Sequence, residues 1–106
     1  MDTLAALADP TRRRILELLA DGDVAAGELS DEFAVSRPAV SRHLRVLREA
    51  GLVQSRVDGQ RRVYSLDARP LAELDEWLTP YRRFWAHRLD ALDTEIRRDS
   101  RKRRDR

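Results

Sequence analysis

The chain has 106 residues, with 21 Lys and Arg against 19 Asp and Glu, two His and no Cys. This length supports one hydrophobic core but leaves little room for a large catalytic cleft, which argues against most enzyme folds. Without cysteine, disulfides, thiolate metal sites and thiol nucleophiles are excluded. No uncharged run exceeds six residues, far fewer than a membrane span or a signal peptide needs, so we expect a cytoplasmic protein with no membrane contact.

Charge is distributed unevenly along the chain. The net charge is −5 over residues 1–35, +5 over 36–62, −3 over 63–96 and +5 over 97–106. A basic middle segment between acidic ones is typical of an element that contacts nucleic acid. The last segment has no apolar side chain and cannot join a core, so we expect one folded domain over residues 1–96, followed by a disordered basic tail.

The N-terminal third predicts two short helices. After a short apolar segment, Asp9 is expected to cap a helix that runs from Pro10 to about Ala20. A second helix is expected from about Ala26 to Phe33. Three arginines in the first turns of the first helix lie where the helix dipole disfavours cations, which indicates a role beyond helix stability: Arg12, Arg13 and Arg14. We expect at least one of them to pair with an acid such as Glu17 rather than with a phosphate.

A third helix is predicted from Ser36, as its N-cap, to Ala50, with Gly51 ending it. Val40, Leu44 and Leu47 form one apolar stripe. At about 100° per residue, the opposite face is almost purely cationic. Because acidic residues are nearly absent there, DNA contact is a better interpretation than an ordinary solvated surface. The candidate DNA contacts on this helix are Arg37, Ala39, Ser41, Arg42, His43 and Arg45. For His43, a structural hydrogen bond and a phosphate contact are equally good interpretations.

Two β-like runs, residues 52–57 and 61–66, flank Asp58-Gly59, a dipeptide typical of a two-residue hairpin loop. Arginines near its tip are further candidate DNA contacts: Arg56, Arg61 and Arg62. A helix pair, a cationic helix and a hairpin in this order predict a winged helix-turn-helix, a mainly α fold with a small β-hairpin. The cationic helix would then enter the major groove, where arginines can hydrogen-bond guanine edges.

The last and longest helix is predicted from Pro70, with apolar residues at every third or fourth position as far as Ile96. Pro80 lies inside this pattern and should kink the helix or divide it. The stripe is longer than one small domain can cover, so we expect a second copy to cover it. The candidate dimerisation residues are Leu4, Leu7, Leu74, Leu78, Tyr81, Trp85, Leu89 and Leu92. The aromatic residues from Trp77 to Trp85 are interpreted as core or interface, with an effector pocket as the alternative.

Two stretches carry a resemblance to a known family: Ala8–Leu16 reads ADPTRRRIL, and Ser36–Val53 reads SRPAVSRHLRVLREAGLV. Both resemble the ArsR/SmtB winged-helix transcriptional repressors, and the likeness extends over about residues 3–66. The segment Trp77–Trp85 resembles a subgroup that lacks cysteine metal motifs. The resemblance implies a sequence-specific regulator that is a homodimer, paired through its first and last helices. It also implies that two recognition helices read an inverted repeat in double-stranded DNA and that an inducer lowers DNA affinity.

The sequence departs from the metal-sensing pattern of that family. It has no Cys-x-Cys on the second helix, and the last helix offers only His87-x-x-Asp90, without the upstream half that would complete a site. One histidine and one carboxylate make a poor metal site, so we expect no metal and no cofactor. Double-stranded DNA, a second copy of the chain and an unidentified effector are the expected partners.

Two other classes of function are weighed against a DNA-binding regulator. An enzyme finds no support, because the chain has no nucleophile with a base, no glycine-rich phosphate loop and no metal constellation. The alternative is a protein-interaction module on a winged-helix scaffold, with weak or no specific DNA binding. The arginine-rich helix and hairpin argue against it, since a protein-docking face normally exposes more apolar surface.

Overall fold

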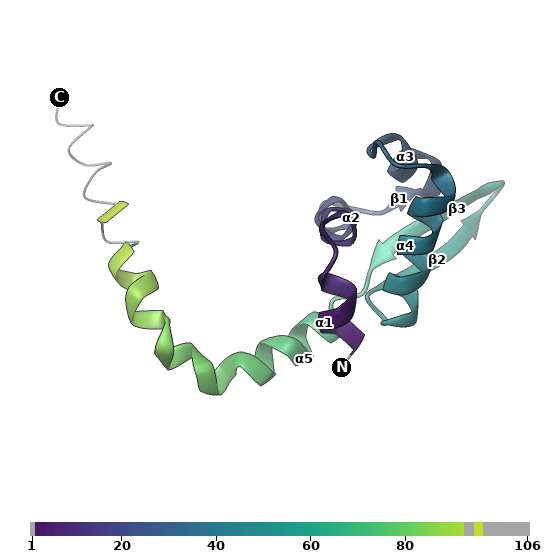
Figure 1. Ribbon diagram of the computed structural model, residues 1–106. Coiled ribbons are helices and arrows are strands. Elements are labelled where there is room, and N and C mark those ends of the chain that lie inside the picture. The colour runs from purple at the N-terminus through teal and green to yellow at the C-terminus, as the bar shows by residue number, and fades with distance from the viewer. Residues whose placement is uncertain (1, 93–94, 97–106) are drawn as a thin grey trace, which may run out of the picture. The chain divides into compact units, whose positions relative to one another are not determined.

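The computed structural model describes residues 2–92 and 95–96, shown in colour in Figure 1. The predicted basic tail, residues 97–106, lies outside this range. The chain divides into two compact units, Met1–Leu74 and Asp75–Arg106. The first unit contains α1 (Asp2–Leu7), α2 (Pro10–Ala20), β1 (Val24–Ala25), α3 (Ala26–Asp31), α4 (Arg37–Glu49), β2 (Val53–Asp58), β3 (Arg61–Leu66) and most of α5 (Arg69–Leu78).

The predicted starts of α2 and α4 are confirmed. The Asp9 carboxylate accepts a hydrogen bond from the Arg12 backbone N–H at 3.0 Å, and Ser36 Oγ accepts one from the Ala39 N–H at 3.3 Å. Each cap satisfies a backbone donor that the helix itself leaves unpaired. In contrast, α3 ends at Asp31, two residues before the predicted end at Phe33.

The predicted end of α4 at Gly51 is also confirmed. Gly51 has φ +76°, a left-handed conformation that suits a residue without Cβ. Its N–H donates to the Arg48 carbonyl, and the Leu52 N–H donates to the Leu47 carbonyl, both at 3.0 Å. These two bonds form a Schellman motif, which pairs the last carbonyls of the helix and turns the chain into β2.

The sheet has three antiparallel strands in the order β1-β3-β2. In the hairpin, Val53 pairs with Leu66 at one end and Asp58 pairs with Arg61 at the other. The hairpin is confirmed, but its two-residue loop consists of Gly59 and Gln60, one position later than predicted. Gly59 has φ +65° at the first loop position, where type II′ turns favour glycine. The short strand β1, which pairs with β3 through Val24↔Tyr64, was not predicted.

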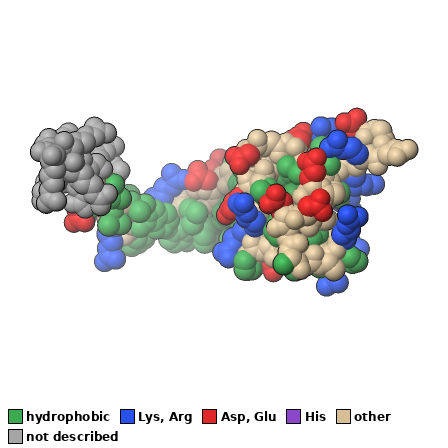
Figure 2. Space-filling model, turned by 90° about the horizontal axis from the view of Figure 1, so that it is seen from above, with side chains coloured by type: hydrophobic (Ala, Val, Ile, Leu, Met, Phe, Trp, Pro, Cys, Tyr) green, Lys and Arg blue, Asp and Glu red, His purple; other side chains and the backbone are tan. Residues whose placement is uncertain are grey.

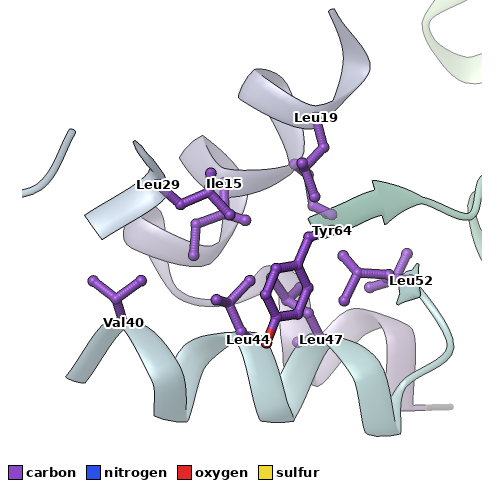
Figure 3. Packing of buried hydrophobic residues seen from close by; sticks show 11 residues of the cluster. Ile15, Leu19, Leu29, Val40, Leu44, Leu47, Leu52 and Tyr64 are labelled. Atoms are coloured by element: carbon purple, nitrogen blue, oxygen red, sulfur yellow. The ribbon is translucent and has the colours of Figure 1, made fainter. Parts of the chain in front are cut away.

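A single core lies between the helices and the sheet of the first unit (Figure 3). The predicted stripe of α4 is confirmed as its inward face, with Val40, Leu44 and Leu47 at most 3% exposed. In Figure 3 these side chains point toward Ile15 of α2 and Tyr64 of β3. Because the inward face of α4 is fully used in packing, its opposite face is left for solvent or a partner.

In the second unit, Pro80 divides the long predicted helix. The α-helix α5 ends at Leu78, a 3₁₀ helix η1 follows over Thr79–Phe84, and helical structure resumes at residue 86. This confirms the prediction for a proline that removes one backbone donor. Most of the described apolar side chains of this unit are exposed, with Leu89 at 55% and Leu92 at 54%, whereas Leu78 is half-buried. Figure 2 shows apolar side chains along this helical segment.

Candidate DNA-binding surface

Helix α4 carries six of the nine predicted DNA contacts. Arg37, Ser41, Arg42 and Arg45 are exposed, whereas Ala39 and His43 are half-buried. Glu49, near the C-terminal end, is the one acidic residue of this helix. Within the part of the chain that the structure describes, the side chains of the four arginines of α4 form no hydrogen bond or ion pair. Their charge is therefore available to an external anion.

The predicted contacts in the hairpin differ from those on α4, because each has a partner within the protein. Arg56 forms an ion pair with Asp23 at 2.7 Å, and Arg61 one with Glu28 at 3.6 Å. Arg62 donates to Ser55 Oγ at 3.4 Å. All three arginines remain exposed. Exposed ion pairs are weak, so a phosphate can compete with the carboxylates for the guanidinium groups of Arg56 and Arg61.

His43 faces the N-terminal end of α2. Its Nδ1 lies 3.3 Å from Arg12 Nη1 and 3.9 Å from Asp9 Oδ2. The hydrogen bond from the Arg12 backbone N–H is the main cause that lowers the pKa of the Asp9 carboxyl below its ordinary value, and the charge of Arg12 adds to it. The structure therefore gives His43 the structural hydrogen bond that was one of its two interpretations.

The arginines in the first turns of α2 have distinct roles. Arg14 forms an ion pair with Glu17 at 3.1 Å, which confirms that at least one of them pairs with an acid. Arg12 instead donates from Nε to the Ala6 carbonyl at 2.7 Å and from Nη2 to the Ala5 carbonyl at 3.1 Å. These carbonyls lie in the last turn of α1, where cations are favourable, so the role beyond α2 stability is to cap α1.

Sequence reasoning missed Asp67, which joins the hairpin to α5. Its carboxylate accepts hydrogen bonds from the backbone and side chain of Arg69 and from Gln54 Nε2. The bonds from Arg69 are the main cause that holds the pKa of the Asp67 carboxyl far below its ordinary value. An aspartate two residues before the start of a helix could have indicated this contact with the Arg69 backbone N–H.

The candidate dimerisation residues are distributed over both units. Leu4 and Leu7 lie on α1, and Leu74 ends the first unit. Those of the second unit are Leu78, Tyr81, Trp85, Leu89 and Leu92. The rings of Trp77 and Tyr81 lie 5.1 Å apart, and Tyr81 is 43% exposed. The aromatic residues of this unit therefore do not form a buried core within the described chain.

Neither a metal centre nor a membrane-spanning element is found in the described ranges. No group of three or more His, Cys, Asp or Glu side chains among residues 2–92 and 95–96 is arranged to hold a metal ion. Over the same residues, no helix is both long enough and apolar enough to cross a bilayer.

Comparison with known proteins places this chain among transcriptional regulators. The family model described as bacterial regulatory protein, arsR family, matches residues 9–55. The HTH-type transcriptional regulator Rv2034 of Mycobacterium tuberculosis is 55% identical over 84 residues, 79% of this chain and 76% of that protein. The transcriptional repressor SdpR of Bacillus subtilis is 40% identical over 73 residues, 69% of this chain and 81% of that protein.

The chain is also similar to solved structures of transcriptional regulators. The crystal structure of a possible transcriptional regulator for arsenical resistance has a TM-score of 0.68 and 44% identity, covering 90% of this chain and 96% of that chain. An ArsR-like transcriptional regulator from Rhodococcus sp. RHA1 has a TM-score of 0.72 and 32% identity, covering 91% of this chain and 88% of that chain.

Proposed function

Because the chain belongs to the ArsR family of DNA-binding transcriptional regulators, we propose that it is a homodimeric repressor whose two α4 helices read an inverted repeat in double-stranded DNA. It acts in the cytoplasm, where that DNA is found. The observation that carries the proposal is the outward face of α4, where the predicted contacts Arg37, Arg42 and Arg45 lack side-chain partners among the described residues.

In this proposal α4 enters the major groove with its N-terminal half first. Arg37 and Arg42 lie where a guanidinium group can form two hydrogen bonds with a guanine edge, and Ser41 and Arg45 lie beside them on the outward face. The hairpin arginines contact the phosphate backbone after leaving their partners within the protein. Base contacts on α4 then give specificity, while phosphate contacts give affinity without regard to sequence.

The exposed apolar side chains of the second unit support the dimer. Tyr81, Trp85, Leu89 and Leu92 are each at least 36% exposed, which is unfavourable unless a partner covers them. A second copy also explains how a short chain recognises an inverted repeat, because the two α4 helices of a dimer bind half-sites about one helical turn apart. An inducer that releases the DNA, as the family implies, completes the proposal, and the absence of cysteine excludes a thiolate-bound metal in that role.

A gel shift tests this function with a duplex taken from upstream of the protein's own gene and a random duplex of equal length. We expect tighter binding to the first duplex, and Arg42→Ala should weaken it by about 1–3 kcal/mol while affecting random DNA much less. Arg48→Ala is the matched control, because it removes the same charge from the last turn of α4. Equal losses on both duplexes with Arg42→Ala would assign base reading to another element. A wild-type protein that binds neither duplex would favour the protein-interaction alternative.

A further inference from the structure

Arg12 connects three elements of the first unit, and each of its three guanidinium nitrogens has a partner. Its Nε and Nη2 donate to the carbonyls of Ala6 and Ala5 in α1, at 2.7 and 3.1 Å. The remaining nitrogen, Nη1, lies 3.3 Å from Nδ1 of His43 on α4. Because α1 holds the guanidinium in place, Nη1 presents a donor to the histidine ring from a fixed direction.

This contact determines which nitrogen of His43 carries the proton. Arginine can only donate hydrogen bonds, so Nδ1 must accept, and the neutral ring then has its proton on Nε2. Nε2 has no partner within the described residues. None of the buried side-chain nitrogen or oxygen atoms described there lacks a partner, so Nε2 reaches the surface. The His43 side chain is accordingly 21% exposed.

The position of His43 on α4 suits an anion beside the reading face. Its inward neighbours on the helix are Leu44 and Leu47, and its side chain lies about 100° round the axis from that of Arg42. A helix in the major groove has a phosphate strand on each side, about 12 Å apart. A donor on the flank of the helix therefore meets a phosphate oxygen rather than a base edge.

We infer that His43 donates its Nε2–H to a phosphate of the DNA backbone, and that Arg12 is the positioning residue that fixes the tautomer and direction of this donor without touching the DNA. The inference rests on the proposed DNA-binding function and assigns this donor to one of the two phosphate strands that border the major groove. It combines the two interpretations of His43, since the structural hydrogen bond at Nδ1 prepares the phosphate contact at Nε2.

Two substitutions separate the roles of the ring nitrogens. In His43→Gln the side-chain amide reaches the position of Nε2, whereas in His43→Asn it reaches only the position of Nδ1. Binding to a random duplex is measured at pH 8 for the wild-type protein and for both variants. We expect His43→Asn to weaken binding by about tenfold or more, the effect of a hydrogen bond to a charged group. His43→Gln should keep most of the DNA affinity that His43→Asn loses. The slope of log affinity against log salt should stay unchanged, because a neutral donor releases no counterion.

The role of Arg12 is tested with a double-mutant cycle. Arg12→Ala should weaken binding more than Arg13→Ala, which removes the same charge from the neighbouring position on α2. In the background of His43→Asn, Arg12→Ala should have little further effect, because it acts through the histidine. Thermal unfolding of each variant accompanies the titrations, and affinities are corrected for the folded fraction.

The outcomes distinguish this inference from the function on which it rests. If the wild-type protein binds neither the random duplex nor the upstream duplex, the DNA-binding function fails. If the wild-type protein binds and His43→Asn binds equally well, the phosphate contact is overturned. Equal weakening by His43→Gln and His43→Asn overturns it too, and additive effects of Arg12 and His43 overturn the positioning role.

Discussion

Releasing the hairpin arginines from their acidic partners should strengthen DNA binding. The Arg56–Asp23 pair has a distance of 2.7 Å, and its side chains are 56% and 46% exposed. An exposed pair of this kind contributes about 0.2–1 kcal/mol, which must be given up when Arg56 turns to a phosphate. Asp23→Asn removes this cost in the free protein, so affinity should rise by up to about fivefold. Glu28→Gln should give a smaller gain, because the Arg61–Glu28 pair is longer, at 3.6 Å, and more exposed.

Fluorescence anisotropy with a labelled random duplex at about 50 mM salt, where surface electrostatics are strong, measures these gains. Each substitution also removes one negative charge from the protein, which itself favours DNA. Glu17→Gln provides the control, because Glu17 pairs with Arg14 at 3.1 Å with similar exposure, but on α2. If Asp23→Asn and Glu17→Gln raise affinity equally, net charge explains the effect, and competition at the hairpin is refuted.

Three further outcomes are expected. Replacing Leu89 and Leu92 together with Glu should convert the proposed dimer to a monomer in sedimentation equilibrium, and a wild-type protein that is monomeric at tens of micromolar (on the order of dimer working concentrations) would contradict the dimer. Leu47→Ala, at a fully buried position of α4, should lower the free energy of unfolding by about 2–5 kcal/mol in urea, whereas Val57→Ala, 70% exposed, should change it little. The pKa of Asp67 is lowered in the folded protein, so its ionised carboxylate stabilises the fold at pH values above 3.8, the ordinary pKa of aspartate, and this stabilisation is lost as the pH falls further. The unfolding free energies of the wild type and Asp67→Asn should therefore converge in acid.

The features that sequence alone predicted are those set by neighbouring residues. Asp9 and Ser36 cap helices by contacting backbone groups three residues away, and Gly51 ends α4 through its own conformation. The inward stripe of α4 and its cationic outward face follow from helical periodicity, which needs no knowledge of the partner. The candidate site was therefore largely predictable on α4.

Features that depend on residues distant in sequence were not predictable. Arg56 and Asp23 are 33 positions apart, so only the folded chain shows that the hairpin arginines are paired. The bond between Arg12 and His43 spans 31 positions and likewise has no local pattern. Strand β1 has two residues, too few for any periodicity, and exists because β3 offers it backbone partners.

The two residues of β1 also affect how this protein family can diversify. By pairing with Tyr64 and Val63, β1 connects the middle of β3 to the segment between α2 and α3. The tip, around Gly59 and Gln60, has no such pairing with β1. Adding two residues to each strand at the tip would lengthen the hairpin by about 7 Å, since a strand rises about 3.4 Å per residue. An insertion of two residues also preserves which side chains face inward. Evolution can thus adjust how far the hairpin reaches along DNA by length changes at one loop, while the reading helix keeps its place.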